Sequence, residues 1–531
     1  MTGGSRGRAV VIGAGVAGLA TAALLGREGY DVQVLEQRDE VGGRAGTWES
    51  AGFRFDTGPS WYLMPEIFEH FFALLGTSSD AELDLVRLDP AYRAWFTSGA
   101  APLEVRSDAA DAEALFESVE PGAGARLRRY LASARDTTEV AREHLLYSTF
   151  QSLPRLLSPA VLRRVPRLLP LVAQTLDRYV GRRFRDERLR RVLGYPAVFL
   201  GTSPDRAPAL YHLMSHADLA DGVLYPSGGF GTLVDALVRL AVREGATVRT
   251  GARVVGVVTT TSPAPRVSGV QYLDEEGREH VAPADVVVGA GDLHHLETAL
   301  LPPDLRTYPE QWWSRRDPGP GAVLVYLGVR GRVPQLTHHT LVFAADWQEN
   351  VDAIYGPDKH VPEPASMYVC APSRTDPTIA PPDSENLFLL VPVPADVTLG
   401  GRGDPVVEQV ADAAVHRLGH VVGIPDLADR VVVRRTVGPA DFARELSSWS
   451  GGALGPAHVL RQSAWWRGRN ASAKVGGLLY AGGSTIPGVG LPMCLISAEL
   501  VVKRLRGDRS SGPLPAPLHP SARTAPARGI R

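Results

Sequence analysis

Runs of apolar residues separated by glycines set the pattern of the N-terminal part of the chain. Residues 9–12 are apolar and mostly β-branched, three glycines follow, and an uncharged stretch continues to residue 26. A short β-branched run, a glycine turn and a long run of small apolar residues predict a strand, a tight turn and a helix. Residues 31–36 predict a second strand that ends at an acidic residue. The chain therefore opens with a strand, helix and strand.

Later segments repeat this mixture of strands and helices. Residues 67–140 alternate short helical patterns with strands, residues 224–234 form a glycine-rich turn into a helix, and residues 477–493 give a strand, two turns and a helix. A short strand pair is predicted within residues 52–61. Further strands are predicted at 94–97, 247–250, 253–258, 267–273, 285–289, 322–328, 367–371 and 387–392.

Residues 153–172 differ in character, because they combine arginines, leucines and prolines. Short helices with an arginine face and a leucine face suit the headgroup region of a bilayer. A solvated helical hairpin on the surface is the alternative. Residues 507–531, rich in Pro, Ser, Arg and Ala, are predicted to be disordered.

Composition narrows the class of protein. The 531 residues are 44% hydrophobic and 21% charged, which is typical of a globular protein large enough for two or more domains. A net charge of -2 gives no reason to expect a nucleic-acid partner. Cys370 and Cys494 stand far apart, so neither a zinc site nor a disulfide framework is indicated. Regular glycines argue against a membrane span in residues 9–26, and no signal peptide is indicated.

The opening strand, turn and helix match the dinucleotide-binding fingerprint. Gly13 turns the chain off the strand, Gly15 lets a pyrophosphate approach the backbone, and Gly18 lets the helix lie close to the sheet. Glu36 ends the second strand about 20 residues further on, where a carboxylate accepts a bond from a ribose hydroxyl.

A second glycine-rich segment favours FAD over NAD. Gly43 turns the chain back over the cofactor, and Arg44 offers paired donors to phosphate oxygens. Backbone N–H groups at the helix predicted from about residue 492 are suited to stabilising negative charge on a reduced flavin. The remaining residues assigned to the cofactor are Gly58, Pro59, Ser60, Val254, Gly482, Gly483, Gly490 and Met493.

No catalytic set is evident. His212 and His216 have a metal-ligand spacing but no third ligand, so a packing or pocket role is preferred and no metal is expected. Phe53 and Phe55 are expected in the core, whereas Trp61 and Tyr62 fit either the core or a substrate wall. The catalytic residues stay unassigned; His212, Arg163 and Tyr62 are uncommitted candidates for a polar group near the flavin ring.

These motifs together resemble the bacterial phytoene desaturase family, FAD-dependent carotenoid desaturases related to flavin amine oxidases. The resemblance runs to about residue 506, and the segments 370–382, 462–464 and 482–498 are its more specific part. Trp465 and Trp466 depart from the usual pattern, in which an aromatic residue precedes Arg-Pro. The motifs that carry the resemblance begin at residues 13, 41, 58, 225, 375, 462 and 482.

The resemblance implies that phytoene, a hydrophobic polyene precursor, is converted stepwise towards lycopene. The expected chemistry is hydride transfer to flavin with proton loss from the adjacent carbon. Because double bonds flank the reacting site, the developing positive charge is delocalised and no strong base is demanded. Other carotenoid or terpenoid desaturases, a carotene isomerase, a flavin amine oxidase and a non-catalytic flavin-binding scaffold are the alternatives. The number of desaturation steps, the electron acceptor and the oligomeric state stay open.

The expected fold is α/β. A discontinuous Rossmann-like FAD-binding domain is predicted from residues 1–75, 225–300 and 465–506, and an inserted α+β substrate domain from 76–224 and 301–464. The second domain includes a helical, membrane-associating part. We expect a cytoplasmic protein associated peripherally with the inner face of the cell membrane, because its substrate is insoluble in water.

Overall fold

The computed structural model describes residues 6–151 and 159–519, and its organising element is a five-stranded parallel sheet. Ile12 pairs with Leu35 on one side and with Gly289 on the other, so the carboxyl ends of the central strands meet at one edge. Strands from the beginning, middle and end of the chain therefore share one sheet. In spatial order they are β19 (Leu478–Tyr480), β13 (Val286–Gly289), β1 (Arg8–Ile12), β2 (Asp31–Leu35) and β9 (Thr247–Arg249).

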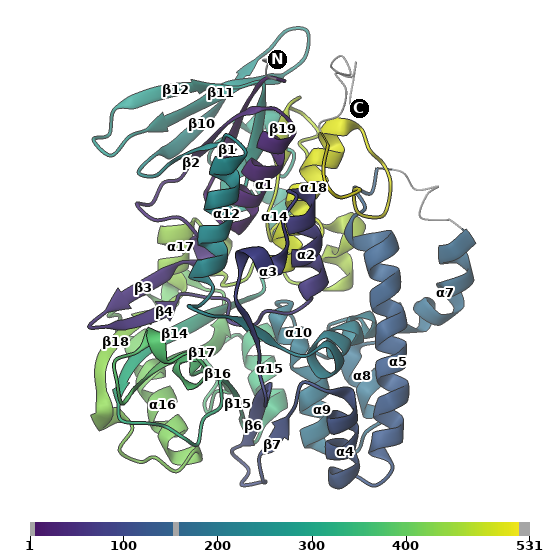
Figure 1. Cartoon of the computed structure of the whole chain (residues 1–531), viewed down its shortest axis with the longest axis vertical. Helices are drawn as coiled ribbons and strands as arrows, with labels where there is room; N and C mark the ends of the chain where they lie inside the picture. Colours follow the sequence, from purple (N-terminus) through teal and green to yellow (C-terminus); the bar gives the residue numbers. More distant parts are fainter. Residues whose placement is uncertain (1–5, 152–158, 520–531) are drawn as a thin grey trace.

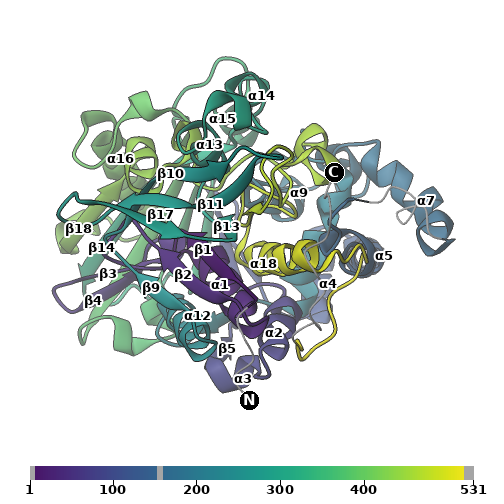
Figure 2. The same ribbon diagram turned by 90° about the horizontal axis from the view of Figure 1, so that it is seen from above.

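Both faces of this parallel sheet are covered, which explains why β1 is apolar throughout. Ala9 and Val11 face a layer of helices, whereas Val10 and Ile12 face a three-stranded antiparallel sheet. In the helical layer α1 packs between α12 and α18 (Figures 1 and 2). The helices are α1 (Val16–Arg27), α12 (Gly231–Arg243) and α18 (Leu491–Arg506); the strands are β10 (Arg253–Thr260), β11 (Arg266–Leu273) and β12 (Glu279–Pro283).

A seven-stranded mixed sheet forms the second large layer, at the other end of the molecule in Figure 1. All its neighbouring pairs are antiparallel except β15 with β6. Helix α16 (Pro405–Val421) covers one face, and the opposite face carries Tyr326, Tyr368 and Phe388. The order is β18 (Val431–Val437), β14 (Pro320–Arg330), β17 (Ser384–Pro394), β16 (Met367–Cys370), β15 (His339–Phe343), β6 (Tyr92–Phe96) and β7 (Leu103–Val105).

Helices α4, α5 and α8 to α10 pack together beside this sheet, and α7 stands outside α5 at the edge of the molecule (Figures 1 and 2). Their bounds are α4 (Ala109–Val119), α5 (Ala123–Ala141), α7 (Pro159–Val172), α8 (Leu176–Gly181), α9 (Glu187–Gly194), α10 (Pro196–Phe199) and α11 (Met214–His216), with π-helical turns η2 (Arg142–Leu146) and η4 (Ala217–Asp221) and the 3₁₀ turn η3 (Ala209–Leu213).

Smaller elements connect these layers. They are the hairpin β3 (Thr47–Ser50) and β4 (Phe53–Asp56), the pair β5 (Leu85–Arg87) and β8 (Leu224–Pro226), the helices α2 (Pro65–Leu74), α3 (Ser79–Glu82), α13 (Leu293–Thr298), α14 (Glu310–Trp313), α15 (Trp347–Tyr355) and α17 (Pro439–Leu446), and the 3₁₀ turns η1 (Gly43–Ala45), η5 (Pro303–Leu305), η6 (Pro372–Arg374), η7 (Pro377–Ile379), η8 (Val397–Leu399), η9 (Ala428–Arg430), η10 (Trp449–Gly451), η11 (Leu460–Gln462) and η12 (Ala464–Trp466).

The other strands predicted from the sequence are confirmed, but the strand pair predicted within residues 52–61 is formed by β3 and β4, which span residues 47–56. Both Phe53 and Phe55 lie in the core as predicted. Strands β8, β12, β15 and β18 were not predicted. The alternation predicted for residues 67–140 is only partly right, because this region ends in the 19-residue helix α5. The domain boundaries stay a prediction, although strands of the parallel sheet come from all three segments assigned to the FAD-binding domain.

The prediction of a disordered C-terminal tail is wrong for residues 507–519. Leu514 and Leu518 are buried against the helical layer, and the backbone N–H of Leu518 donates to the Leu74 carbonyl at 2.8 Å. The Lys503 Nζ also donates to the carbonyls of Ser510 and Gly512, at 2.8 and 2.6 Å. Two buried leucines and these hydrogen bonds together hold the proline-rich segment in place. Residues 520–531 lie outside the described part of the chain.

Candidate functional site

A single cavity of about 1200 Å³ brings the predicted site residues together. It extends from the carboxyl edge of the parallel sheet to the mixed sheet and the helices α5 and α7. Every predicted cofactor residue except Gly18 lines it. Those residues are Gly13, Gly15, Glu36, Gly43, Arg44, Gly58, Pro59, Ser60, Val254, Gly482, Gly483, Gly490 and Met493.

The three glycines of the fingerprint have different surroundings. Gly13 has a φ of +100°, which a residue with a side chain rarely adopts. A Cβ on Gly15 would come no closer than 3.9 Å to another part of the chain, so the backbone there faces the open cavity. A Cβ on Gly18 would lie 1.9 Å from the Gly13 carbonyl oxygen. Gly18 therefore serves helix packing and not the cavity wall.

Glu36 lines the cavity beside the carboxyl edge of the parallel sheet. Its side chain is buried, and its two oxygens accept backbone N–H groups from Ala14 at 2.7 Å and Arg38 at 3.0 Å. A carboxylate oxygen has a second lone pair, so each can still accept a hydroxyl hydrogen. Val254, at the start of β10, lines the same end.

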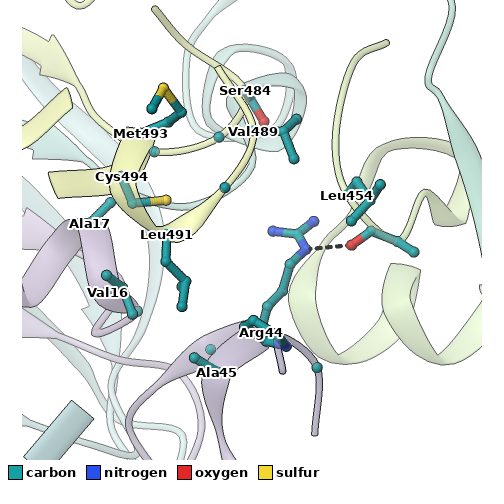
Figure 3. Close-up of a pocket in the computed structure, with 18 of the residues that line it drawn as sticks. Val16, Ala17, Arg44, Ala45, Leu454, Ser484, Val489, Leu491, Met493 and Cys494 are labelled. Carbon is teal, nitrogen blue, oxygen red and sulfur yellow. Dashed lines mark hydrogen bonds between the residues drawn. The ribbon is translucent and has the colours of Figure 1, made fainter. Parts of the chain in front are cut away.

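Arg44 reaches across the cavity to the opposite wall (Figure 3). Its Nε donates to the Ala453 carbonyl at 3.1 Å and its Nη2 to Ser448 Oγ at 2.7 Å. Two donors of the guanidinium are thus used by the chain itself. The prediction that Arg44 offers paired donors to phosphate oxygens therefore rests on the donors that remain, chiefly at Nη1.

The C-terminal glycine segment forms the wall beside α1. Figure 3 shows Ser484, Val489, Leu491 and Met493 on the same side of the pocket as Val16 and Ala17. Helix α18 begins at Leu491, as predicted to within one residue.

Arg467, which sequence reasoning missed, braces this segment. It is 3% exposed and donates to the carbonyls of Gly483 at 2.6 Å and Thr485 at 3.0 Å. Burial lowers the pKa of Arg467 to about 10, so it remains a cation at neutral pH. Its position directly after Trp465 and Trp466 was the only signal in the sequence.

The far end of the cavity is apolar and aromatic. Trp61 lines it and stacks on the His339 ring, with ring centroids 4.3 Å apart. Tyr62 instead stacks on Phe68 in the core and does not line the cavity, which settles the two open alternatives. Other apolar lining residues are Leu63, Met64, Leu145, Leu146, Phe150, Val172, Phe199, Leu213, Met214, Leu324, Phe388, Leu390 and Val437.

Two tyrosine–histidine pairs border this apolar end. The Tyr211 Oη lies 2.9 Å from His458 Nδ1, and the Tyr368 Oη lies 2.7 Å from His339 Nδ1. Tyr368 Oη is also 2.6 Å from Ser60 Oγ. No spacing in the sequence pointed to these pairs, because each joins residues from separate segments.

The structure places some of the candidate polar residues named from the sequence, and it reveals a further cluster of possible metal ligands. His212 is fully buried, with its Nε2 3.0 Å from Ser133 Oγ, and burial lowers its pKa to about 4. The preferred packing role of His212 is therefore confirmed, and the side chain of Arg163 lies outside what the structure describes. His338, His339 and Cys370 have donor atoms within 4.8 Å of one another. Both histidine Nδ1 atoms have hydroxyl partners, whereas both Nε2 atoms are buried without a partner among the described residues. We assign no metal ligand here.

Comparison with known proteins identifies the relatives of this chain. The family described as flavin containing amine oxidoreductase matches residues 16–506. A carotenoid 3,4-desaturase of Haloarcula japonica is 39% identical over 498 residues, which cover 94% of this chain and 98% of the relative. A zeta-carotene-forming phytoene desaturase of Myxococcus xanthus is 37% identical over 508 residues, covering 94% and 93%.

Solved structures support the fold alone. Putrescine oxidase bound to putrescine has a TM-score of 0.57 at 16% identity, covering 94% of this chain and 99% of the other. An oxidoreductase from Methanosarcina mazei has a TM-score of 0.56 at 14% identity, covering 93% and 100%.

Proposed function

This chain belongs to the family of flavin containing amine oxidoreductases and is a FAD-dependent oxidoreductase of the carotenoid desaturase type, and from that premise we propose that it desaturates phytoene stepwise towards lycopene. One observation carries the proposal. The cavity joins a nucleotide cradle at Gly15 and Glu36 to a long apolar end walled by aromatic residues, with no break between them. A dinucleotide and a hydrocarbon chain can therefore lie end to end.

The residues at the nucleotide end fit FAD. The open backbone at Gly15 faces the cavity at the start of α1, where a pyrophosphate is favoured by the helix N-terminus. Glu36 keeps lone pairs for ribose hydroxyls, and the segment from Gly482 to Met493 would lie along the flavin end. When bound, FAD supplies the two-electron oxidation of a carbon–carbon single bond.

The chain itself would position the hydrocarbon and exclude water. Positive charge that develops beside a polyene is delocalised, so a strongly basic side chain is not required. Trp61, Phe199 and Phe388 give the cavity flat faces that suit a conjugated chain. Their role is to hold one bond of the substrate in a fixed orientation.

We further propose that the substrate enters from a membrane surface. At about 0.8 kcal/mol per buried CH₂, passage of so long a hydrocarbon through water costs tens of kcal/mol. Leu460 and Trp466 line the cavity and are 43% and 56% exposed, and Leu169 of nearby α7 is 62% exposed. No helix in the described part of the chain has the length and apolar character needed to cross a bilayer.

The described part of the predicted membrane segment, residues 159–172, fits a cavity mouth at Leu460 and Trp466. In α7 Leu171 is buried, whereas Val165, Arg167 and Leu169 face outward, and Val172 lines the cavity. Apolar side chains and arginines on one exposed helix suit the headgroup region of the inner face of the cell membrane. Residues 153–158 of the predicted segment lie outside the described part of the chain.

A second candidate substrate is a carotenoid that is already conjugated. It is favoured by the 39% identity to a relative named carotenoid 3,4-desaturase. Phytoene and such a carotenoid differ in where the reacting bond lies along the chain, and a cavity lined by apolar residues does not by itself distinguish them.

The experiment that tests both candidates is reconstitution in liposomes. Purified protein with FAD is incubated with phytoene or with lycopene, and products are identified by visible absorption and mass. New long-wavelength bands from phytoene support the first candidate, and loss of two hydrogens from lycopene alone supports the second. Bound flavin without any dehydrogenated product would refute both and favour an isomerase or a non-catalytic scaffold, whereas oxidation of an added amine would favour an amine oxidase.

A further inference from the structure

We propose that Ser60, Tyr368 and His339 form a relay that accepts the proton lost by the substrate during desaturation. Ser60 Oγ, Tyr368 Oη and His339 Nδ1 are linked by distances of 2.6 and 2.7 Å. Ser60 and Tyr368 line the cavity, whereas His339 is fully buried behind Trp61. This inference rests on the proposed function and names the groups that serve it.

The site needs such an acceptor because its reacting end is apolar. When two hydrogens are removed from a carbon–carbon single bond, one would leave as hydride, and bound FAD would supply the acceptor for its two electrons. The other leaves the adjacent carbon as a proton, and the electron pair of that C–H bond becomes the new π bond. Ser60 Oγ takes this proton, the Ser60 hydroxyl proton moves to Tyr368, and the Tyr368 proton moves to His339 Nδ1. His339 becomes an imidazolium, and no further oxidant is required.

The other tyrosine–histidine pair at the cavity cannot serve in this way. His458 Nε2 accepts the backbone N–H of Val489 at 3.1 Å, and a neutral imidazole carries only one N–H. The proton must therefore be on Nδ1, which donates to Tyr211 Oη. His458 has no free lone pair and holds the C-terminal loop in place.

In the Ser60 relay the tyrosine donates to the histidine, which is the reverse of the Tyr211–His458 pair. If Ser60 donates to Tyr368 and Tyr368 donates to His339 Nδ1, each hydroxyl hydrogen has an oxygen or nitrogen acceptor. The reverse order leaves the Ser60 hydrogen with only the nearby Cys370 sulfur, a weak acceptor, among the described residues. The favoured order places a lone pair on His339 Nδ1 and leaves Ser60 free to accept a proton from the cavity. It also makes the Nε2–H of His339 a buried donor without a partner among the described residues.

The surroundings of His339 act on a transient cation in opposite directions, since burial disfavours the charge and the stacked Trp61 ring favours it. The indole of Trp61 stacks on its ring with an interplanar angle of 8°, and an aromatic face attracts a cation. Burial, with a smaller contribution from His338, lowers the pKa of His339 well below its ordinary value, so the resting side chain is neutral. The other titratable groups beside it are Tyr368 and Cys370, and burial raises the pKa of both.

The first test is kinetic and uses a matched pair of variants. Tyr368→Phe breaks the relay, whereas Tyr62→Phe removes a buried hydroxyl that has no partner among the described residues and lies away from the cavity. We expect Tyr368→Phe to lower kcat by roughly 10²-fold, the usual contribution of general acid–base catalysis, with KM and flavin content unchanged. A kcat equal to that of Tyr62→Phe would overturn the relay.

The second test needs no substrate and so separates the relay from the proposed function. In the ¹⁵N NMR spectrum of the FAD-loaded protein, the His339 signal, assigned by its loss in His339→Gln, should show Nε2 protonated and Nδ1 as acceptor. A proton on Nδ1 would overturn the relay even if carotenoids are desaturated. If the wild-type protein desaturates no carotenoid, the proposed function fails, and this spectrum still decides whether His339 is poised to accept a proton.

Discussion

At the residue scale, one turn contains two glycines that the chain needs for different reasons. Gly15 faces open space, whereas Gly18 is pressed against the Gly13 carbonyl. The sequence motif predicted these different roles, with Gly15 open to a pyrophosphate and Gly18 allowing the helix to lie close to the sheet. The surroundings of the two Cα atoms agree with both roles.

Alanine at these two positions should therefore affect two different properties, FAD binding at Gly15 and stability at Gly18. Gly15→Ala is expected to retain the apo-protein Tm but to weaken FAD binding by about 10-fold or more, because its methyl group enters the space left for the pyrophosphate. Gly18→Ala should lower the apo-protein Tm, because its methyl group would overlap the Gly13 carbonyl. Thermal unfolding without FAD and a fluorescence titration with FAD check both. Equal losses of stability would contradict this assignment.

At the scale of elements, the sequence predicted most strands, but it missed two strands of the mixed sheet, β15 and β18. Strand β15 begins at His339, which pairs in register with Cys370. Cys370 belongs to the strand predicted at 367–371, whereas no strand was predicted at β15, although Thr340, Val342 and Phe343 are strand-favouring residues. Strand β18 has three valines followed by Arg434 and Arg435, and it lies at the edge of the mixed sheet, where exposed arginines are tolerated.

Helix α7 provides the prediction at this scale. Val165→Asp with Leu169→Asp places two carboxylates on its outward face, where they would be repelled by anionic headgroups and lose apolar contact. We expect sedimentation with anionic liposomes to fall several-fold, while FAD content is retained. The control is Val281→Asp, at a 60% exposed position on β12, remote from the cavity mouth. If the double variant still sediments like the control, α7 is not the docking element.

At the scale of the whole molecule, a buried carboxyl joins the mixed sheet to the helices. Asp218 Oδ2 accepts hydrogen bonds from Tyr92 of β6 and from Tyr195 after α9, both at 3.1 Å. Burial raises the pKa of Asp218 from 3.8 to about 7. At intermediate pH the folded protein therefore keeps a proton that the unfolded chain has released.

This linkage predicts the pH dependence of global stability. The protonated Asp218 side chain contributes fully to the free energy of unfolding below about pH 4. This contribution is lost as the pH rises through about 7, because the pKa of Asp218 is higher in the folded protein than in the unfolded chain. Between about pH 4 and pH 7, the free energy of unfolding of the wild type, relative to that of Asp218→Asn, should fall by roughly 1.4 kcal/mol for each unit by which the pH rises. Chemical denaturation of both proteins from pH 4 to pH 8 measures the difference. Parallel curves would show that Asp218 does not titrate in this range.

By itself the sequence determined the parallel sheet, the glycine turns and the acidic residue that follows them. These features are local, since strand pattern, turn chemistry and helix spacing act over a few residues. The same local signals predicted that the glycine-rich segments at residues 13–18 and 482–493 serve one site, and both segments contribute to the lining of one cavity.

Only the tertiary structure decided which polar side chains border the apolar end of the cavity. Ser60, His339 and Tyr368 are contributed by three separate segments, and no periodicity connects them. It also decided that Arg44 binds the opposite wall and that residues 507–519 are anchored. The physical reason is that contacts between distant segments depend on how the two sheets and the helices pack, which local sequence patterns do not encode.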